Sequence, residues 1–383
     1  MKLTKNDKIF GLLLVLIYFF ETFEMFVTEE PTAMYNYTIY TLFGFSLITT
    51  FFMRRAIKEP YTSTVLMLAV SMYAFSMVMI SWAPFPAKMY YLTNLMPVFV
   101  LLGSLSCCNQ PQEGNELKLI GVLLLALIVY YFQHYQQNII NEITTQNIAS
   151  YTILYFTPFI LCVRNNQYKI IGMLVIALVV LTSLKRGGIL ALGVGFISYF
   201  LFELLKNNSS KKRQAQYIAI FVLILAGLFY IYTYLEQVTD NALSGRFLSM
   251  ENDDGSGRMD VWSWIFSDLC HNSFFDWIFG HGWNAVNNNN GIRSAHNDFL
   301  EILYDFGIIV FALYIILYKR LFGACAKLLK NKSIYAAPLF CSTMMLLVNS
   351  LVSHVVFYPK YMVIYCLFWA YVDVKTKNEL IIK

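Results

Sequence analysis

Long, uninterrupted hydrophobic segments recur along the whole chain and are separated by short polar segments. Many of them reach about 18 residues, which is long enough for an α-helix to cross roughly 30 Å of hydrocarbon. Their apolar residues follow one another without the alternation that the strands of a membrane barrel require. The pattern therefore predicts an all-α, polytopic membrane protein.

The segments predict about twelve transmembrane helices within a single membrane domain, residues 1–383. The expected spans lie near residues 9–28, 32–53, 61–83, 89–107, 118–133, 148–163, 170–184, 189–205, 217–235, 299–318, 334–353 and 360–373. Between the ninth and tenth spans lies one long polar segment, residues 236–298. A loop of this length in a compact protein usually carries function, so we expect it to hold part of an active site.

Composition agrees with the membrane class. Of the 383 residues, 58% are hydrophobic, 17% are aromatic and 13% are charged, whereas a soluble domain has about 25% charged residues. Three lysines precede the first hydrophobic segment, and no small-residue cleavage site follows it. The sequence therefore predicts an uncleaved first helix and no secretory signal peptide.

The basic residues divide unequally between the two sides of the predicted topology. Of the 28 Lys and Arg residues, 21 fall on the side that includes both ends of the chain. Cytoplasmic loops carry such an excess, so we expect both termini in the cytoplasm and residues 236–298 outside. The formal net charge of +5 follows from this bias, and it gives no indication of a nucleic-acid partner.

The outer loop uses arginine alone as its basic residue. Up to position 295 it contains eight acidic residues and no lysine, and its arginines are Arg246, Arg258 and Arg293. Arginine binds phosphate groups in a bidentate manner, whereas lysine acts as a point charge. The arginines are thus candidates for phosphate recognition, with pairing to neighbouring acids as the alternative.

A second basic site on the outer side is the pair Lys185 and Arg186, which stands between two hydrophobic segments. Basic residues on this side oppose the topology rule, which indicates a use for the pair. The alternative is two ordinary charged residues at a span boundary.

Three local patterns lie within the loop. Residues 259–269 place Val261, Trp262, Ile265 and Leu269 at helical spacing, which predicts a helix on the membrane surface. A turn is expected at Gly280-His281-Gly282, and residues 287–290, all asparagine, are expected to form a flexible connection.

All five histidines fall on the outer side or at outer span ends. His296 is the best placed, because it precedes the span at 299–318, where a helix N-terminus favours a neutral imidazole that can accept a proton. Asp298 and Glu301 have the spacing of a capping box, and Ser294 is a competing cap. The alternative is that His296 is a polar residue at the membrane interface.

The cysteines give no metal-binding spacing, and Cys270, in the outer loop, is expected to be buried. The acidic residues 251–254 could bind a metal or form a solvated turn, and the turn is favoured.

Three blocks in this order resemble the bacterial O-antigen ligase and O-antigen polymerase superfamily. They are residues 183–187 (SLKRG), residues 256–262 (SGRMDVW), and the third block formed by 280–282 (GHG) and 296–301 (HNDFLE) with Gly307. The predicted spans and the late outer loop agree with the family. One departure is Lys185, which stands where serine is common.

The resemblance implies a metal-independent, inverting glycosyltransferase without a cofactor. Its donor would be a glycan on undecaprenyl diphosphate. Arg186 and Arg258, with Arg246 or Arg293 as further candidates, would bind the diphosphate, and His296 would act as general base on the acceptor hydroxyl.

Four further residues are expected to support the site: Asn297 by orienting the His296 ring, His281 by shaping its loop, and Glu301 and Lys185 as neighbours. The resemblance further implies a bacterial cytoplasmic membrane protein with its site on the extracytoplasmic face. Its partners would be the lipid-linked donor, a saccharide acceptor, membrane lipid and a chain-length regulator.

Several functions stay open. A repeat-unit polymerase is preferred because the loop is rich in saccharide-compatible groups, and an O-antigen ligase that transfers polymer to lipid A–core or protein is the alternative. A secondary transporter would need acids such as Glu21, Glu24 or Asp305 near the middle of the membrane. A metal-dependent glycosyltransferase would use Glu29 and Glu30 in the first outer loop.

Overall fold

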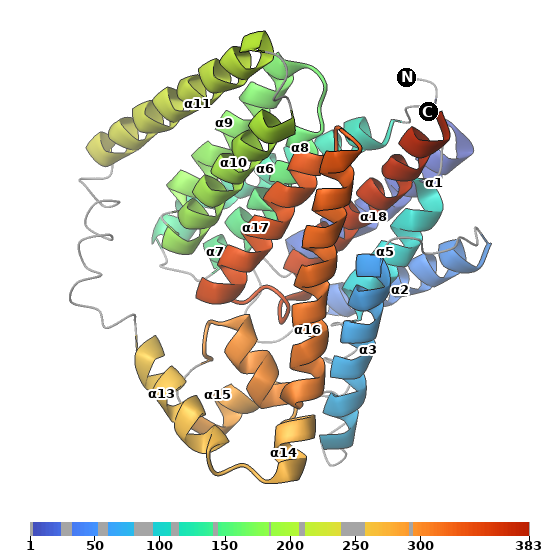
Figure 1. Cartoon of the computed structure of the whole chain (residues 1–383), viewed down its shortest axis with the longest axis vertical. Helices are drawn as coiled ribbons and strands as arrows, with labels where there is room; N and C mark the ends of the chain where they lie inside the picture. The colour runs from blue at the N-terminus through green and yellow to red at the C-terminus, as the bar shows by residue number, and fades with distance from the viewer. Residues whose placement is uncertain are drawn as a thin grey trace.

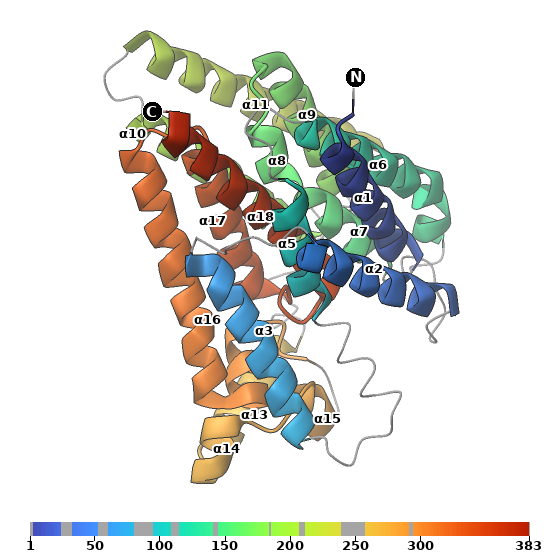
Figure 2. The same ribbon diagram turned by 90° about the vertical axis from the view of Figure 1, so that its right-hand side faces the viewer.

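The computed structural model describes residues 3–23, 33–52, 60–79, 95–108, 115–140, 145–183, 185–206, 211–238, 257–290 and 294–382. Within these ranges the regular structure is helical (Figures 1 and 2). The helices are α1 (Lys5–Phe23), α2 (Ala33–Phe52), α3 (Pro60–Met79), α5 (Met96–Cys107), α6 (Glu116–Ile140), α7 (Thr145–Leu154), α8 (Thr157–Leu161), α9 (Asn166–Thr182), α10 (Arg186–Lys206), α11 (Lys211–Val238), α13 (Arg258–Leu269), α14 (Phe274–Phe279), α15 (Ala285–Asn290), α16 (Asp298–Lys330), α17 (Ala336–Val352) and α18 (Pro359–Ile382).

A helix stands at each position where the hydrophobic pattern predicts a span, although the sixth is divided into α7 and α8. Three helical segments in the described chain are long and apolar enough to cross a membrane, namely 116–133 of α6, α10 and α16. Shorter apolar helices occupy 96–107, 149–161, 166–182 and 336–352. The all-helical class is thereby confirmed, and the number of membrane crossings stays a prediction.

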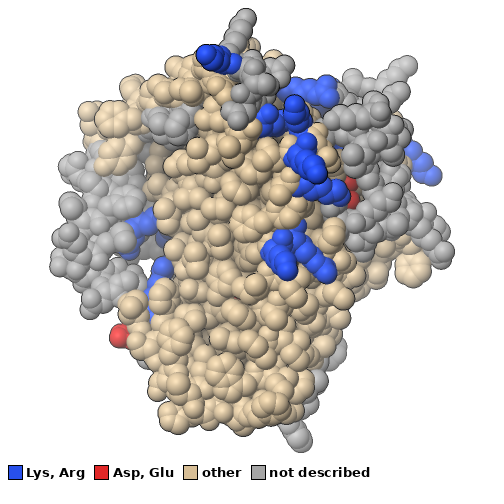
Figure 3. All heavy atoms as spheres, viewed as in Figure 1, with Lys and Arg blue, Asp and Glu red and all other residues tan. Residues whose placement is uncertain are grey.

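The two ends of the chain lie at the same end of the helical assembly, and α13, α14 and α15 lie at the opposite end (Figures 1 and 2). On the face seen in Figure 3, lysine and arginine side chains are visible from the end near the termini down to about the middle, and none is visible around the lower end. The described part of the outer loop thus lies away from the termini, and the membrane topology stays a prediction.

The core is centred on α18, where every residue from Lys360 to Thr376 is buried. A helix that is apolar around its whole circumference belongs in an interior, because it has no polar face to offer to water. The largest of its buried side chains is Trp369, whose backbone carbonyl accepts a hydrogen bond of 3.4 Å from Tyr61 of α3. Tyr155, between α7 and α8, packs on Tyr365 with ring centroids 4.7 Å apart. Helix α18 therefore forms the centre of the core, and α3 and the segment between α7 and α8 pack against it.

Helix α16 is interrupted at Gly307, whose φ of 73° no ordinary helical residue adopts. A Cβ atom at Gly307 would collide with the carbonyl group of Ile278, and one at Gly280 would collide with the backbone of Asp305. The two backbones also bond directly, because Gly282 N–H donates to the Asp305 carbonyl at 2.7 Å. The glycines thus let the predicted 280–282 turn dock on the kink of α16.

Residues 259–269 form a helix, α13, as predicted, while its position on the membrane surface stays a prediction. Its apolar stripe is buried against the protein itself: Val261, Ile265 and Leu269 pack in one cluster with Ala295 and Tyr304. This cluster fixes α13 to the first turns of α16.

Two expectations for the outer loop are wrong. Residues 285–290 form helix α15 in place of a flexible connection, because the Asp305 carboxylate accepts hydrogen bonds from the N–H groups of Asn284 (2.8 Å) and Val286 (3.1 Å). This cap from another helix outweighs the poor helix propensity of asparagine. Cys270, expected to be buried, is exposed at the end of α13.

Candidate active site

Several of the residues singled out by the sequence converge on a short segment that connects α17 to α18, residues 353–358, termed here the 353–358 connection. Asp298, at the first turn of α16, is fully buried and accepts hydrogen bonds from the N–H groups of Val355 (3.1 Å) and Val356 (3.3 Å). A buried carboxylate requires such donors, because without them its desolvation is not compensated. The start of α16 and the connection are therefore fixed to each other.

Glu301, one turn further along α16, makes a second link to the connection. One of its carboxylate oxygens lies 3.0 Å from Nδ1 of His354, and the other accepts a hydrogen bond from the N–H of Ala295. Nε2 of His354 lies 2.9 Å from the hydroxyl of Ser294. His354 is 4% exposed, so its imidazole is held on both sides inside the protein.

These neighbours set the charge of His354. Burial by itself lowers the pKa of an imidazole, but the negative charge of Glu301 and the hydrogen bonds to Asp298 and Glu301 outweigh burial and raise the pKa of His354 to about 9. His354 is therefore an imidazolium at neutral pH, paired with two carboxylates.

His296 lies directly against this group. Its ring centroid is 4.7 Å from that of His354, and its side chain is half-buried. Its φ is +49°, in the left-handed region that side-chain-bearing residues rarely adopt. Backbone strain of this kind collects at functional sites, where the surrounding structure enforces it.

The residues around His296 differ from the expected roles in one respect. Asn297 was expected to orient the His296 ring, and Asp298 with Glu301, or Ser294, to cap the following helix. The N-cap of α16 is instead Asn297, whose side chain accepts from the N–H groups of Phe299 (3.0 Å) and Leu300 (3.2 Å). An Asn side chain satisfies free N–H groups at a helix start, which leaves both carboxylates to the 353–358 connection.

The blocks of the two family-matched arginines lie at the end of α17, directly before the connection. Arg258, the first residue of α13, donates to the carbonyl of Val352 at 2.9 Å. Arg186 is the first residue of α10, and Lys185 beside it is half-buried. Next to them Gly187 lies close to Val352, since a Cβ there would meet that side chain at 3.5 Å. The blocks around Arg186 and Arg258 are thus brought together at the end of α17.

Tyr151 of α7 lies between these blocks. Its hydroxyl bonds to Ser353 and to the Gly188 backbone, and it lies within electrostatic reach of Arg258. The first two of the three sequence blocks therefore share one tyrosine.

His281 occupies a separate place. Its Nε2 lies 3.1 Å from the Asn272 side-chain oxygen, and its ring stacks on Tyr304 with centroids 4.4 Å apart. These contacts fit the expected role of shaping the loop. Arg246 and Arg293 lie outside the described residues, as do Glu24, Glu29, Glu30 and residues 251–254.

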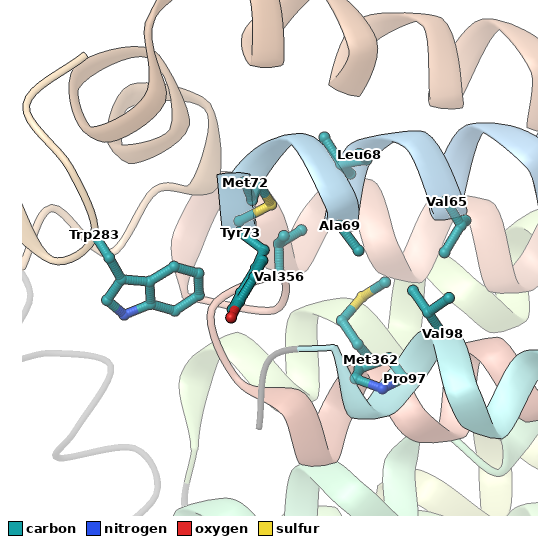
Figure 4. A pocket seen from close by; sticks show the side chains of 10 residues that line it. All are labelled: Val65, Leu68, Ala69, Met72, Tyr73, Pro97, Val98, Trp283, Val356 and Met362. Atoms are coloured by element: carbon teal, nitrogen blue, oxygen red, sulfur yellow. The ribbon is translucent and has the colours of Figure 1, made fainter. Parts of the chain in front are cut away.

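A cavity of about 400 Å³ opens beside His354. Its lining comes from the 280–290 segment, the start of α16 and the 353–358 connection: Trp283, Asn284, Asn287, Asn288, Ser294, Glu301, His354, Phe357 and Tyr358. Figure 4 shows Trp283 at the edge of a second, apolar pocket of about 30 Å³, where α3, α5 and the connection meet. Trp283 thus separates a polar cavity from an apolar one.

Comparison of the chain with known protein families agrees with the three sequence blocks. Residues 171–315 match the protein family described as O-antigen ligase. This part of the chain belongs to the O-antigen ligase family. The family comprises helical membrane proteins that transfer glycans in polysaccharide and lipopolysaccharide biosynthesis. No curated protein matches the chain.

The family segment holds Arg186, Arg258 and His296, but it ends within α16 and does not reach the 353–358 connection. The three sequence blocks likewise end at Gly307, and the sequence analysis therefore assigned no role to His354. One signal was present, since His354 shares the outer span ends with the other histidines. Among the described residues no group of three or more His, Cys, Asp or Glu side chains is arranged to hold a metal ion.

The raised pKa of His354 predicts a pH-dependent stability. A group whose pKa rises on folding from 6.5 to about 9 stabilises the fold fully below pH 6.5, and this contribution disappears as pH rises through 9. The linkage amounts to about 3 kcal/mol. We expect the melting temperature of the purified protein to fall between pH 7 and 10, and to fall less in His354→Gln.

His271→Gln is the matched control, because His271 is exposed and bonds to its own helix at the Ser267 carbonyl. Its melting profile is expected to follow wild type. An identical pH dependence in wild type and His354→Gln would contradict the ion pair.

Proposed function

We propose that this chain is a membrane glycosyltransferase that transfers a glycan from undecaprenyl diphosphate to a saccharide hydroxyl, and that it acts as a repeat-unit polymerase for a surface polysaccharide. The observation that supports it best is the convergence of the Arg186, Arg258 and His296 blocks on the 353–358 connection, beside a polar cavity. An O-antigen ligase is the second candidate, because the matched family carries that description.

In this proposal Arg186 and Arg258 bind the diphosphate of the donor. Negative charge grows on the leaving diphosphate as the glycosidic bond breaks, and fixed guanidinium groups stabilise it. Lys185, Arg246 and Arg293 are further candidates. Twelve membrane spans would place this site on the extracytoplasmic face of a bacterial cytoplasmic membrane, with both termini in the cytoplasm.

His296 acts as general base in this proposal. It takes the proton of the acceptor hydroxyl while that oxygen attacks the anomeric carbon, and the configuration inverts. The ring of His354 lies 4.7 Å from that of His296 and holds it against the start of α16. No metal and no cofactor take part in the proposed step.

Of the three acids that a transporter would require, Glu24 lies outside the described residues, and the other two have partners of their own. Glu21 accepts a hydrogen bond of 3.0 Å from Thr152, and Asp305 caps α15. These contacts are structural and favour the transferase.

Deletion of the gene in its native host tests the function itself. A polymerase deletion should leave surface chains of a single repeat unit, whereas a ligase deletion should leave undecorated acceptor with accumulated lipid-linked polymer. The surface polysaccharide, separated by size, is the measurement. Unchanged polysaccharide would exclude both activities.

Arg258→Lys is expected to abolish most transfer, because lysine cannot reproduce a bidentate contact with a diphosphate. Arg186→Ala should do the same, while the amount of protein in the membrane stays close to wild type. Arg320→Lys is the control, since Arg320 instead bonds to the start of α3. Normal polysaccharide in Arg258→Lys or Arg186→Ala would exclude that residue as a diphosphate ligand.

His296→Gln is expected to bind the donor nearly as well as wild type and to turn over at least ~10²-fold more slowly, because glutamine cannot accept the proton. The assay is transfer by the purified enzyme from a synthetic undecaprenyl-diphosphate oligosaccharide, alongside donor binding. His281→Gln should lose less. Retained turnover in His296→Gln, or collapse in His281→Gln alone, would show that another residue is the base.

A further inference from the structure

The cavity beside His354 carries a distinctive set of side chains. Three asparagine amides, three aromatic rings, one hydroxyl and the His354–Glu301 pair form its lining, and neither lysine nor arginine is among the described residues that line it. Its volume of about 400 Å³ lies within the range of about 300–1,000 Å³ that is usual for small-molecule sites. The lining is therefore chemically different from the surroundings of Arg186 and Arg258.

The short helix that carries two of the amides is fixed at its start. Asn287 and Asn288 are exposed on α15, and the buried Asp305 carboxylate fixes the start of that helix. An amide offers two donors and one acceptor, so neighbouring amides can bond to adjacent hydroxyl groups in either direction. Several amides on one short helix and its preceding turn suit a ligand with many hydroxyl groups and no charge.

Three aromatic side chains, those of Trp283, Phe357 and Tyr358, also belong to the lining. Trp283 packs on Phe357 with ring centroids 5.2 Å apart, and Tyr358 is 42% exposed. Aromatic faces provide apolar contact area for the C–H face of a ring, while amides at the edge take its hydroxyl groups. A saccharide presents both kinds of surface.

The lining also contains side chains that can bind or release a proton. Glu301 and His354 belong to the lining, and the His296 ring contacts that of His354 at a tilt of 38°. Arg258 bonds instead to Val352, at the end of α17. Arg258 and the cavity thus lie on different parts of the site. A hydroxyl group held in the cavity is close to His354, and therefore to the pair that His354 forms with His296.

We propose that this cavity binds the saccharide of the acceptor, held by Asn287, Asn288 and Tyr358. The assignment rests on the proposed glycosyltransferase function and adds the location of the acceptor.

A binding experiment tests the site without catalysis. The probe is a one-repeat oligosaccharide released from the host's own surface polysaccharide, which has no lipid and no diphosphate. It is titrated calorimetrically into the full-length protein in detergent. Replacing both amides in Asn287→Ala/Asn288→Ala should weaken binding about tenfold, as expected for the loss of two hydrogen bonds. Tyr358→Ala should also weaken it.

Asn289→Ala is the matched control. Asn289 is exposed on the same helix, but it bonds to Tyr304 and lies outside the lining. The Asn289→Ala variant should therefore bind the oligosaccharide about as well as wild type. Alanine is a better helix former than asparagine, and melting curves establish that each variant is folded. No binding by wild type at millimolar probe, or equal binding by the double variant and wild type, would overturn the proposal.

Transfer kinetics separate acceptor from donor. With the oligosaccharide as acceptor, the double variant should need about tenfold more of it for half-maximal rate, with the donor concentration dependence unchanged. A shift in the donor dependence alone would place the donor glycan in the cavity and overturn the acceptor assignment. Wild type that binds the probe but transfers nothing would refute the glycosyltransferase function instead.

Discussion

The bonds between the Asp298 carboxylate and the N–H groups of Val355 and Val356 are the interaction on which the site depends. The carboxylate is fully buried at the start of α16, where the helix dipole adds to the two donors in stabilising its charge. Neither partner is satisfied without the other, because a buried carboxylate and buried N–H groups both need a hydrogen bond. The start of α16 is thereby joined to the connection between α17 and α18.

This link fixes more than two helices. It places His354 beside Glu301 and Ser294, and so beside His296. Val352, the residue directly before this connection, accepts a hydrogen bond from Arg258. A segment of a few residues therefore positions both the proposed base and one of the proposed diphosphate ligands. Buried charge pairs contribute little net stability in general, and their use here is to fix geometry and protonation.

The outer loop is ordered by a related device. Gly280 and Gly307 allow two backbones to meet where no side chain fits, and Asp305 then caps α15. The result is a short polar helix that presents asparagine amides to the cavity from a fixed position. The kink in α16 and the shape of the cavity have one cause, since both follow from this close approach.

The sequence by itself determined the helical class and the positions of the helices, because continuous apolar segments of this length have no other stable backbone structure in lipid. It also marked Arg186, Arg258 and His296 through short motifs. Only the tertiary structure assigned His354 and the 353–358 connection to the site, because their partners on α16 are more than fifty positions away in the chain. It likewise decided that α15 is a helix, since its cap comes from Asp305 of α16, and that Asn297, rather than Asp298, caps α16, since both carboxylates are engaged by the connection. Local spacing carries no record of such long-range partners, and it is these that set the charge and geometry of the site.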